Sequence, residues 1–175
     1  MKTLAQLKRN TEQWSKIPHT KIDKKTGKKV VYNDDIVGRA METNAAVIKV
    51  SSSRQRGVDT MVFVVRCRAH TESVYYDVVI ELLPGEVHKD VFKMPSEQSP
   101  CWVKCSCPFF LFKCEYALAR VGSSEIDYSN GKKPIITNPK QFPILCKHLY
   151  RATDAVLKAA IQQAKNDSRK YNFEK

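Results

Sequence analysis

The sequence predicts an α+β fold in which an antiparallel β-meander is flanked by helices. Four segments rich in β-branched and aromatic residues follow one another through turn-like connections. Short connections favour antiparallel neighbours, because parallel strands need a long crossover. Segments with a helical spacing of apolar residues precede and follow these strands. The 175 residues, 42% of them hydrophobic, suffice for one domain with a proper core.

The N-terminal segment predicts a helix over residues 3–17, because apolar residues recur there at roughly helical spacing: Leu4, Leu7, Trp14 and Ile17. Pro18 is placed to stop this helix. The lysine-rich segment 21–29 contains a Thr-Gly turn and predicts a loop or a small exposed hairpin. We therefore interpret residues 1–44 as a basic extension, made of helix and loop or hairpin, before a main unit over 45–175.

The middle of the chain predicts four strands, over residues 45–50, 60–68, 73–83 and 101–105. Arg54 and Arg56 fall in the connection between the first two strands. Arg66 and Arg68 share one face of the second strand, because side chains alternate along a strand with a period of two.

The pattern changes to helix after the fourth strand. Pro108 can occupy the first turn of a helix that reaches about Val121, since proline lacks only an amide proton that would be unpaired there. Residues 122–145 are rich in glycine, serine, asparagine and proline, which predicts a long loop. A second helix is expected over residues 146–166, with a narrow stripe of small and apolar residues: Leu149, Ala152, Val156, Ala160 and Ala164.

Two short pairs of metal-binding residue types flank the predicted helix and loop. Cys105-Ser106-Cys107 places two thiols on one face of an extended segment, and Cys146-Lys147-His148 adds a thiol and an imidazole. A helix N-terminus stabilises the thiolate form that zinc requires. The pattern therefore predicts one structural zinc ion that joins the strand end to the C-terminal helix. Four protein ligands leave no open position for water or substrate, so the site is expected not to be catalytic.

Other residues compete for the role of ligand. Cys67 and His70 form a CxxH pair, although Cys67 lies in an apolar strand where a buried thiol is the more common interpretation. Cys101 shares strand parity with Cys105, and Cys114 lies inside the first helix after the CxC pair. Either could replace a ligand if the register shifts, and the roles of these three cysteines stay open.

The CxC and CxH pairs together resemble the SWIM-type zinc finger. The resemblance covers residues from about 100 to 160 and includes the strand before Cys105 and the helix after His148. The spacer of 38 residues (108–145) is longer than in many SWIM fingers and is similar to that of bacteriophage-encoded SWIM proteins. The resemblance to SWIM fingers implies a DNA- or protein-binding module. The similarity to the phage-encoded proteins implies a virion component of the neck, tail or baseplate.

The charge predicts an anionic partner. Thirty basic against eighteen acidic side chains give a net charge of +12, and the pI is about 9.5. Nucleic acid, an anionic membrane or an acidic protein surface would suit this charge, and a merely solubilising surface is the remaining interpretation. The candidate contacts are Lys21, Lys24, Lys25, Lys28, Lys29, Arg54, Arg56, Lys132 and Lys133.

Other function classes are disfavoured by the sequence. The start of the chain lacks the apolar region of a signal peptide, and no apolar run is long enough to span a membrane, so synthesis in the cytoplasm and no membrane partner are expected. No phosphate-binding, nucleophile-elbow or HExxH motif is present. Asp34 and Asp35 are interpreted as a turn or helix cap. We therefore expect no enzyme and no small-molecule substrate, but an interaction or structural protein that binds other protein chains in an assembly, with nucleic-acid binding as the alternative.

Overall fold

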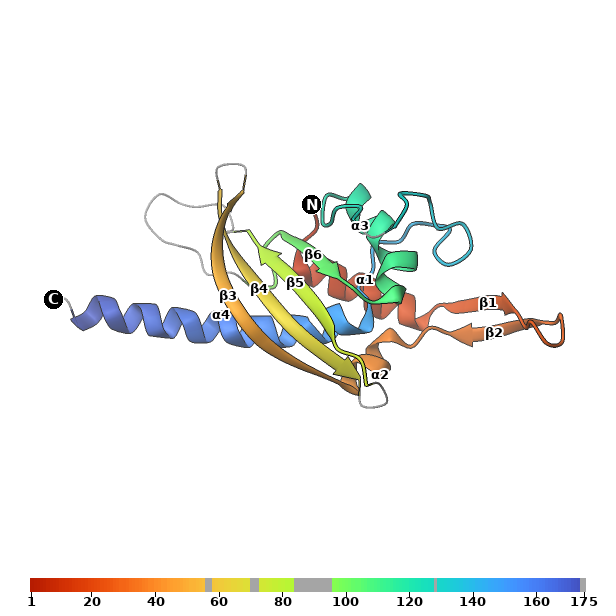
Figure 1. Ribbon diagram of the computed structural model, residues 1–175, viewed down its shortest axis with the longest axis horizontal. Helices are drawn as coiled ribbons and strands as arrows, with labels where there is room; N and C mark the ends of the chain where they lie inside the picture. The colour runs from red at the N-terminus through yellow and green to blue at the C-terminus, as the bar shows by residue number, and fades with distance from the viewer. Residues whose placement is uncertain (56–57, 70–72, 84–95, 128, 174–175) are drawn as a thin grey trace.

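The computed structural model describes residues 1–55, 58–69, 73–83, 96–127 and 129–173, and shows an α+β protein with antiparallel sheets (Figure 1). Its elements in chain order are α1 (Leu4–Lys16), β1 (Pro18–Ile22), β2 (Lys29–Asn33), α2 (Ile36–Met41), β3 (Thr43–Gln55), β4 (Val58–Ala69), β5 (Tyr76–Leu82), β6 (Cys101–Cys105), η1 (Phe110–Cys114), α3 (Glu115–Arg120) and α4 (Lys147–Phe173).

The larger sheet is the predicted antiparallel meander. Its four strands lie in the order β3-β4-β5-β6, so every strand pairs with its neighbour in the sequence. Alternate residues of β4, β5 and β6 are buried on one face, among them Phe63, Ile80 and Val103. β3 and β4 are longer than predicted, because their pairing continues through polar residues beyond Val50, whose side chains gave no strand signal. The pairing register shifts between Val47 and Lys49.

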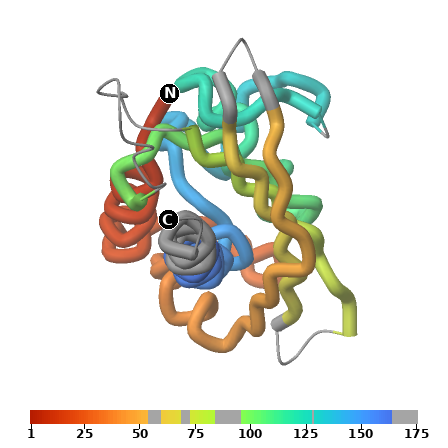
Figure 2. Tube along the Cα trace, turned by 90° about the vertical axis from the view of Figure 1, so that its left-hand side faces the viewer, coloured from red at the N-terminus to blue at the C-terminus, as the bar shows by residue number. Residues whose placement is uncertain are grey.

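Two helices bury their apolar stripes in the same core as the sheet. α4 contacts all four strands of the meander, and Figure 2 shows the strands curving around one side of it. The stripe predicted for α4 is buried at Leu149, Ala152, Val156 and Ala160. α1 contributes Leu4, Leu7 and Trp14 to this core. The prediction that Ile17 belongs to the apolar stripe of α1 was wrong, because Ile17 lies just beyond the helix and is 46% exposed.

The short helix α2 was not predicted. Asp35 caps its N-terminus by accepting a hydrogen bond from the N–H of Gly38 at 2.8 Å, which fits the interpretation of Asp35 as a cap. Ile36 and Ala40 are fully buried and hold α2 in the core. Six residues are too few to show a helical period, so the sequence pattern carried no signal.

The lysine-rich segment is the tip of a hairpin. β1 and β2 pair antiparallel from Pro18 opposite Asn33 to Ile22 opposite Lys29. The two strands project away from the meander (Figure 1). Asp23 and Gly27 close the tip, where the N–H of Gly27 donates to the carbonyl of Asp23 at 2.8 Å. This hairpin is one of the two structures that the sequence allowed.

The helix predicted after Pro108 has a widened turn within it. η1 is a short π-helix over Phe110–Cys114, and α3 continues directly from it to Arg120. The described part of residues 122–145 has no helix or strand and packs beside η1 and α3, as the loop prediction required (Figure 1). We call residues 122–145 the insert. Within the described residues, no helix combines the length and the apolar character that a membrane span needs.

Candidate metal centre

The four predicted ligands meet at one buried point. The sulfur atoms of Cys105, Cys107 and Cys146 and a ring nitrogen of His148 all lie within 4.8 Å of one another. All four residues are at most 2% exposed. Two sulfur atoms bonded to one zinc at about 2.3 Å can be at most about 4.6 Å apart, so these atoms come close to outlining one coordination sphere. The cluster could hold one metal ion, plausibly zinc.

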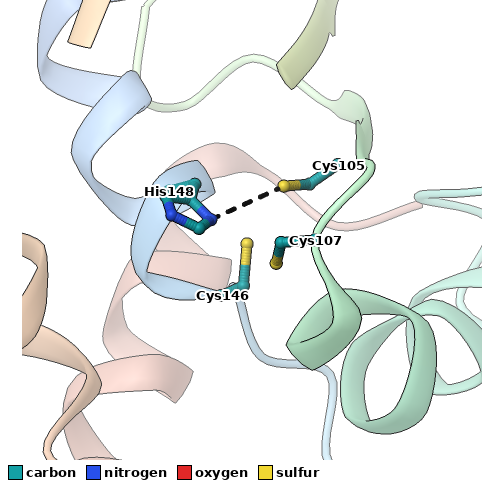
Figure 3. A group of neighbouring side chains, drawn as sticks. All are labelled: Cys105, Cys107, Cys146 and His148. Carbon is teal, nitrogen blue, oxygen red and sulfur yellow. Dashed lines mark hydrogen bonds between the residues drawn. The ribbon is translucent and has the colours of Figure 1, made fainter. Parts of the chain in front are cut away.

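The two pairs come from elements far apart in the sequence. Cys105 ends β6, and Cys107 follows two residues later, immediately before the helical segment that contains η1. Cys146 precedes α4, and His148 lies in its first turn. Figure 3 shows the three sulfur atoms and the imidazole approaching one another between these segments. The cluster therefore links the end of the meander to the C-terminal helix.

The two helix starts give their cysteines the same local geometry. The N–H of Phe110 donates to Sγ of Cys107 at 3.4 Å, and the N–H of Leu149 donates to Sγ of Cys146 at 3.4 Å. Each donor lies three residues after its cysteine, and the N–H of Phe110 is shared with the carbonyl of Cys107 at 3.0 Å. Such bonds stabilise a negative sulfur, which is the form that ligates zinc.

The imidazole is oriented toward the sulfur atoms. Nδ1 of His148 lies 3.9 Å from Sγ of Cys105, which makes Nδ1 the candidate ligand atom (Figure 3). The ring of Tyr76 packs against the ring of His148 with centroids 4.6 Å apart. A cavity of about 250 Å³ borders the centre and is lined partly by Arg39, Tyr76 and Lys147. Two of its lining residues are cationic, so they lower the cost of negative charge on the sulfur cluster.

The three thiols of the cluster influence one another's pKa through burial and hydrogen bonds. Burial raises the pKa of Cys105 and of Cys146. Hydrogen bonds from Cys105, and then from Cys146, lower the pKa of Cys107. Three buried thiolates require a cation such as Zn²⁺ to offset their desolvation.

The competing cysteines lie outside this cluster. Cys67 donates from Sγ to the carbonyl of His148 at 3.6 Å, and Cys101 donates to the carbonyl of Lys2 at 3.6 Å. Burial raises the pKa of both thiols to about 12. Cys114 is fully buried, and burial raises its pKa as well. His70 lies outside the described residues. Within the described part of the chain, the group of Cys105, Cys107, Cys146 and His148 is the only metal-competent cluster.

The candidate basic contacts are spread over separate elements. The five lysines from Lys21 to Lys29 are exposed on the β1–β2 hairpin, and Lys132 and Lys133 are exposed on the insert. Arg54 belongs to the far end of β3, and Arg56 lies outside the described residues. Figure 1 shows the hairpin and the far end of β3 on opposite sides of the molecule. Among the described residues, the lysines of the hairpin therefore lie far from the end of β3 that carries Arg54.

Sequence reasoning missed two long-range contacts, of which the first holds the segment before Cys146. α1 holds the segment before Cys146 through Asn10 Nδ2, which donates to the carbonyl of Pro143 at 3.1 Å, and through the side chain of Thr11. Asp34 was interpreted only as part of a turn or cap, but it is buried and accepts from Lys113 Nζ at 2.6 Å. No short motif signals either contact, because the partners are distant in the sequence.

The fold and the cluster define an α+β protein with a buried Cys₃His site that could bind a metal ion and that links the meander to α4. No protein-family model, curated protein or solved structure matches this chain.

Proposed function

We propose that this protein is a non-enzymatic interaction protein whose fold is stabilised by one structural zinc ion in a SWIM-type site. The burial of all four candidate ligands carries this proposal. Three thiolates and one imidazole form a tetrahedral donor set that suits zinc and leaves no position for a substrate. In this role Cys105, Cys107, Cys146 and His148 hold the metal, and the N–H groups of the two helix starts stabilise the sulfur ligands.

The metal would act as a clasp across the insert. It would fix the end of β6 to the start of α4, although 38 residues (108–145) separate Cys107 from Cys146. Closing such a long loop is entropically costly, and a metal that binds only the folded chain offsets that cost. Binding to a partner would then be carried out by the surfaces of the elements that the metal holds in place.

Binding to other protein chains is the role that we favour for those surfaces, in a particle such as a phage neck, tail or baseplate. The resemblance to phage-encoded SWIM proteins supports this context. The wide separation of the basic residues also supports it, because a nucleic-acid interface needs its cations along one continuous track. The test is mass spectrometry of purified particles, in which a fixed number of copies per particle is expected. A chain found only free in the lysate would contradict this role.

The metal is tested by element analysis of the purified protein. We expect one zinc per chain, and we expect Cys105→Ser and Cys146→Ser to lose the zinc and to lower Tm. Cys101→Ser is the matched control, since Cys101 is buried but lies outside the cluster. A Cys105→Ser variant that keeps both its zinc and its Tm would refute the ligand assignment.

Nucleic-acid binding is a second candidate because the hairpin carries five exposed lysines around a fixed turn. A β-ribbon of this kind can enter a groove of duplex DNA. Titration with a DNA duplex at low salt should then give sub-micromolar affinity with a steep dependence on salt. Lys24→Glu with Lys25→Glu should weaken that binding, whereas Lys158→Glu on α4 should not. No binding at low salt would exclude this candidate.

A further inference from the structure

The insert and the neighbouring η1 expose large apolar side chains around a cleft. Phe112 is 65% exposed, Ile135 is 76% exposed and Ile136 is 94% exposed. They line a cleft of about 440 Å³ between the η1–α3 helix and the insert, together with Leu111, Tyr116 and Pro134. Scattered apolar residues are normal on a surface, but several gathered around one cleft indicate a binding site.

The cleft is built by specific contacts between its two walls. Thr137 Oγ1 donates to the carbonyl of Phe112 at 2.6 Å, and Asn138 Nδ2 donates to the carbonyl of Lys113 at 2.9 Å. On the other side, the N–H of Ser129 donates to the carboxylate of Glu115 at 2.8 Å. These bonds tie the insert to the helix at both ends of the cleft. A preformed cleft binds with a smaller entropic cost than a loop that must first be ordered.

The polar groups of the cleft indicate the chemistry of its occupant. Ser129 Oγ is buried in the cleft wall and, among the described residues, has no hydrogen-bond partner. Lys113 and Lys132 line the cleft, and no acidic residue does so within the described chain. Lys113 already pairs with Asp34, whereas Lys132 and its neighbour Lys133 are exposed.

We propose that this cleft docks an extended segment of a partner protein that carries large apolar residues next to acidic ones. The apolar residues would contact Phe112, Ile135 and Ile136, and the acidic residues would pair with Lys132 and Lys133. A second copy of the chain fits less well, because its net charge of +12 repels a basic rim. Nucleic acid fits less well, because exposed isoleucines contribute nothing to phosphate contacts. The inference rests on the proposed interaction role, and it gives that role a surface and a class of partner.

The test uses the full-length, zinc-loaded protein and a random peptide display library. The peptides that are enriched should contain large apolar and acidic residues, and NMR should show their contacts at residues 111–137. Ile136→Asp should raise the Kd of a synthetic enriched peptide by about tenfold or more, as for other apolar anchors. Lys132→Glu with Lys133→Glu should also raise it. Ile161→Asp is the matched control, since Ile161 is 52% exposed on α4.

The proposal would be overturned if no peptide were enriched, or if the enriched peptides bound Ile136→Asp as tightly as the wild type. It would also be overturned if Ile136→Asp abolished self-association of the chain or its binding to duplex DNA, because the cleft would then serve a different partner. Ile136 is almost fully exposed, so unchanged Tm and zinc content will show that Ile136→Asp is folded. Peptide binding to a chain that holds no zinc would refute the proposed clasp but not this cleft. A zinc-loaded, folded chain that binds no peptide would refute the cleft alone.

Discussion

Thr11 and Leu145 are joined by a buried hydrogen bond in which the main-chain N–H of Leu145 donates to Thr11 Oγ1 at 2.9 Å. The hydroxyl of Thr11 donates in turn to the carbonyl of Leu7 at 2.8 Å, so its hydrogen atom is directed into α1. Leu145 directly precedes Cys146. One side chain of α1 thus fixes the main chain that enters the metal cluster.

Thr11→Val should destabilise the protein although the shape of the side chain is preserved. The buried N–H of Leu145 would lose its acceptor, which costs about 1–3 kcal/mol of unfolding free energy. Zinc affinity should also fall about tenfold, because Cys146 would be held less firmly. Denaturant unfolding and competition with a chelator measure the two effects. Thr20→Val, at an exposed position of β1, is the control. Equal stability and affinity in Thr11→Val and wild type would contradict this role.

Removal of the metal should loosen the junction between β6 and α4 more than the distant part of the sheet. Without the metal, no cation offsets the cost of burying three sulfur ligands. The unfolding free energy should therefore fall by several kcal/mol. Calorimetry with and without a strong chelator measures the loss of Tm. Hydrogen exchange should quicken first at the amides of Phe110 and Leu149, which donate to the sulfur atoms. An unchanged Tm after complete chelation would show that the cluster is not a clasp.

Asp34 should make stability depend on pH. Its carboxylate lies between Arg39 at 2.5 Å and Lys113 at 2.6 Å. Burial opposes ionisation, but the hydrogen bond from Lys113 and the two positive charges prevail and lower the pKa of Asp34. A folded-state pKa below the unfolded value of about 3.9 stabilises the protein above that pH and ceases to do so as the pH falls through the folded value.

Asp34→Asn therefore tests this ion pair directly. At pH 7 it should lower the unfolding free energy by about 3 kcal/mol, because Lys113 would be left partly buried without its partner. The difference between wild type and variant should shrink as the pH falls below about 4. The difference is the quantity to measure, since acid also removes metal from both proteins. Asp35→Asn retains a cap oxygen at the start of α2 and is the neighbouring control. A difference that does not change with pH would contradict the lowered pKa.

The predictable features were those encoded by neighbouring residues. The period of two along β4 places Arg66 and Arg68 on one face, and Phe63 and Val65 are buried on the other. The CxC and CxH pairs indicate metal chemistry from spacing alone. Contacts between distant residues gave no such signal. The hydrogen bond of Thr11 spans 134 positions. The π-helix over Phe110–Cys114 was not predicted either, since the sequence pattern indicated one continuous helix there.

Glu115 should be the anchor on which the order of the insert depends. It is fully buried, and its two carboxylate oxygens accept from the N–H of Asp127 at 3.1 Å and from the N–H of Ser129 at 2.8 Å. Glu115→Gln replaces one oxygen by an NH₂ group, which cannot accept, so one of these bonds must break at a cost of about 1–3 kcal/mol. Hydrogen exchange of Asp127 and Ser129 should quicken, whereas zinc content should stay at the wild-type level because the cluster does not use this carboxylate. Glu125→Gln, at an exposed position of the same insert, is the control. If Glu115→Gln released the zinc but left the amide of Ser129 protected, the carboxylate would support the metal centre and not the insert.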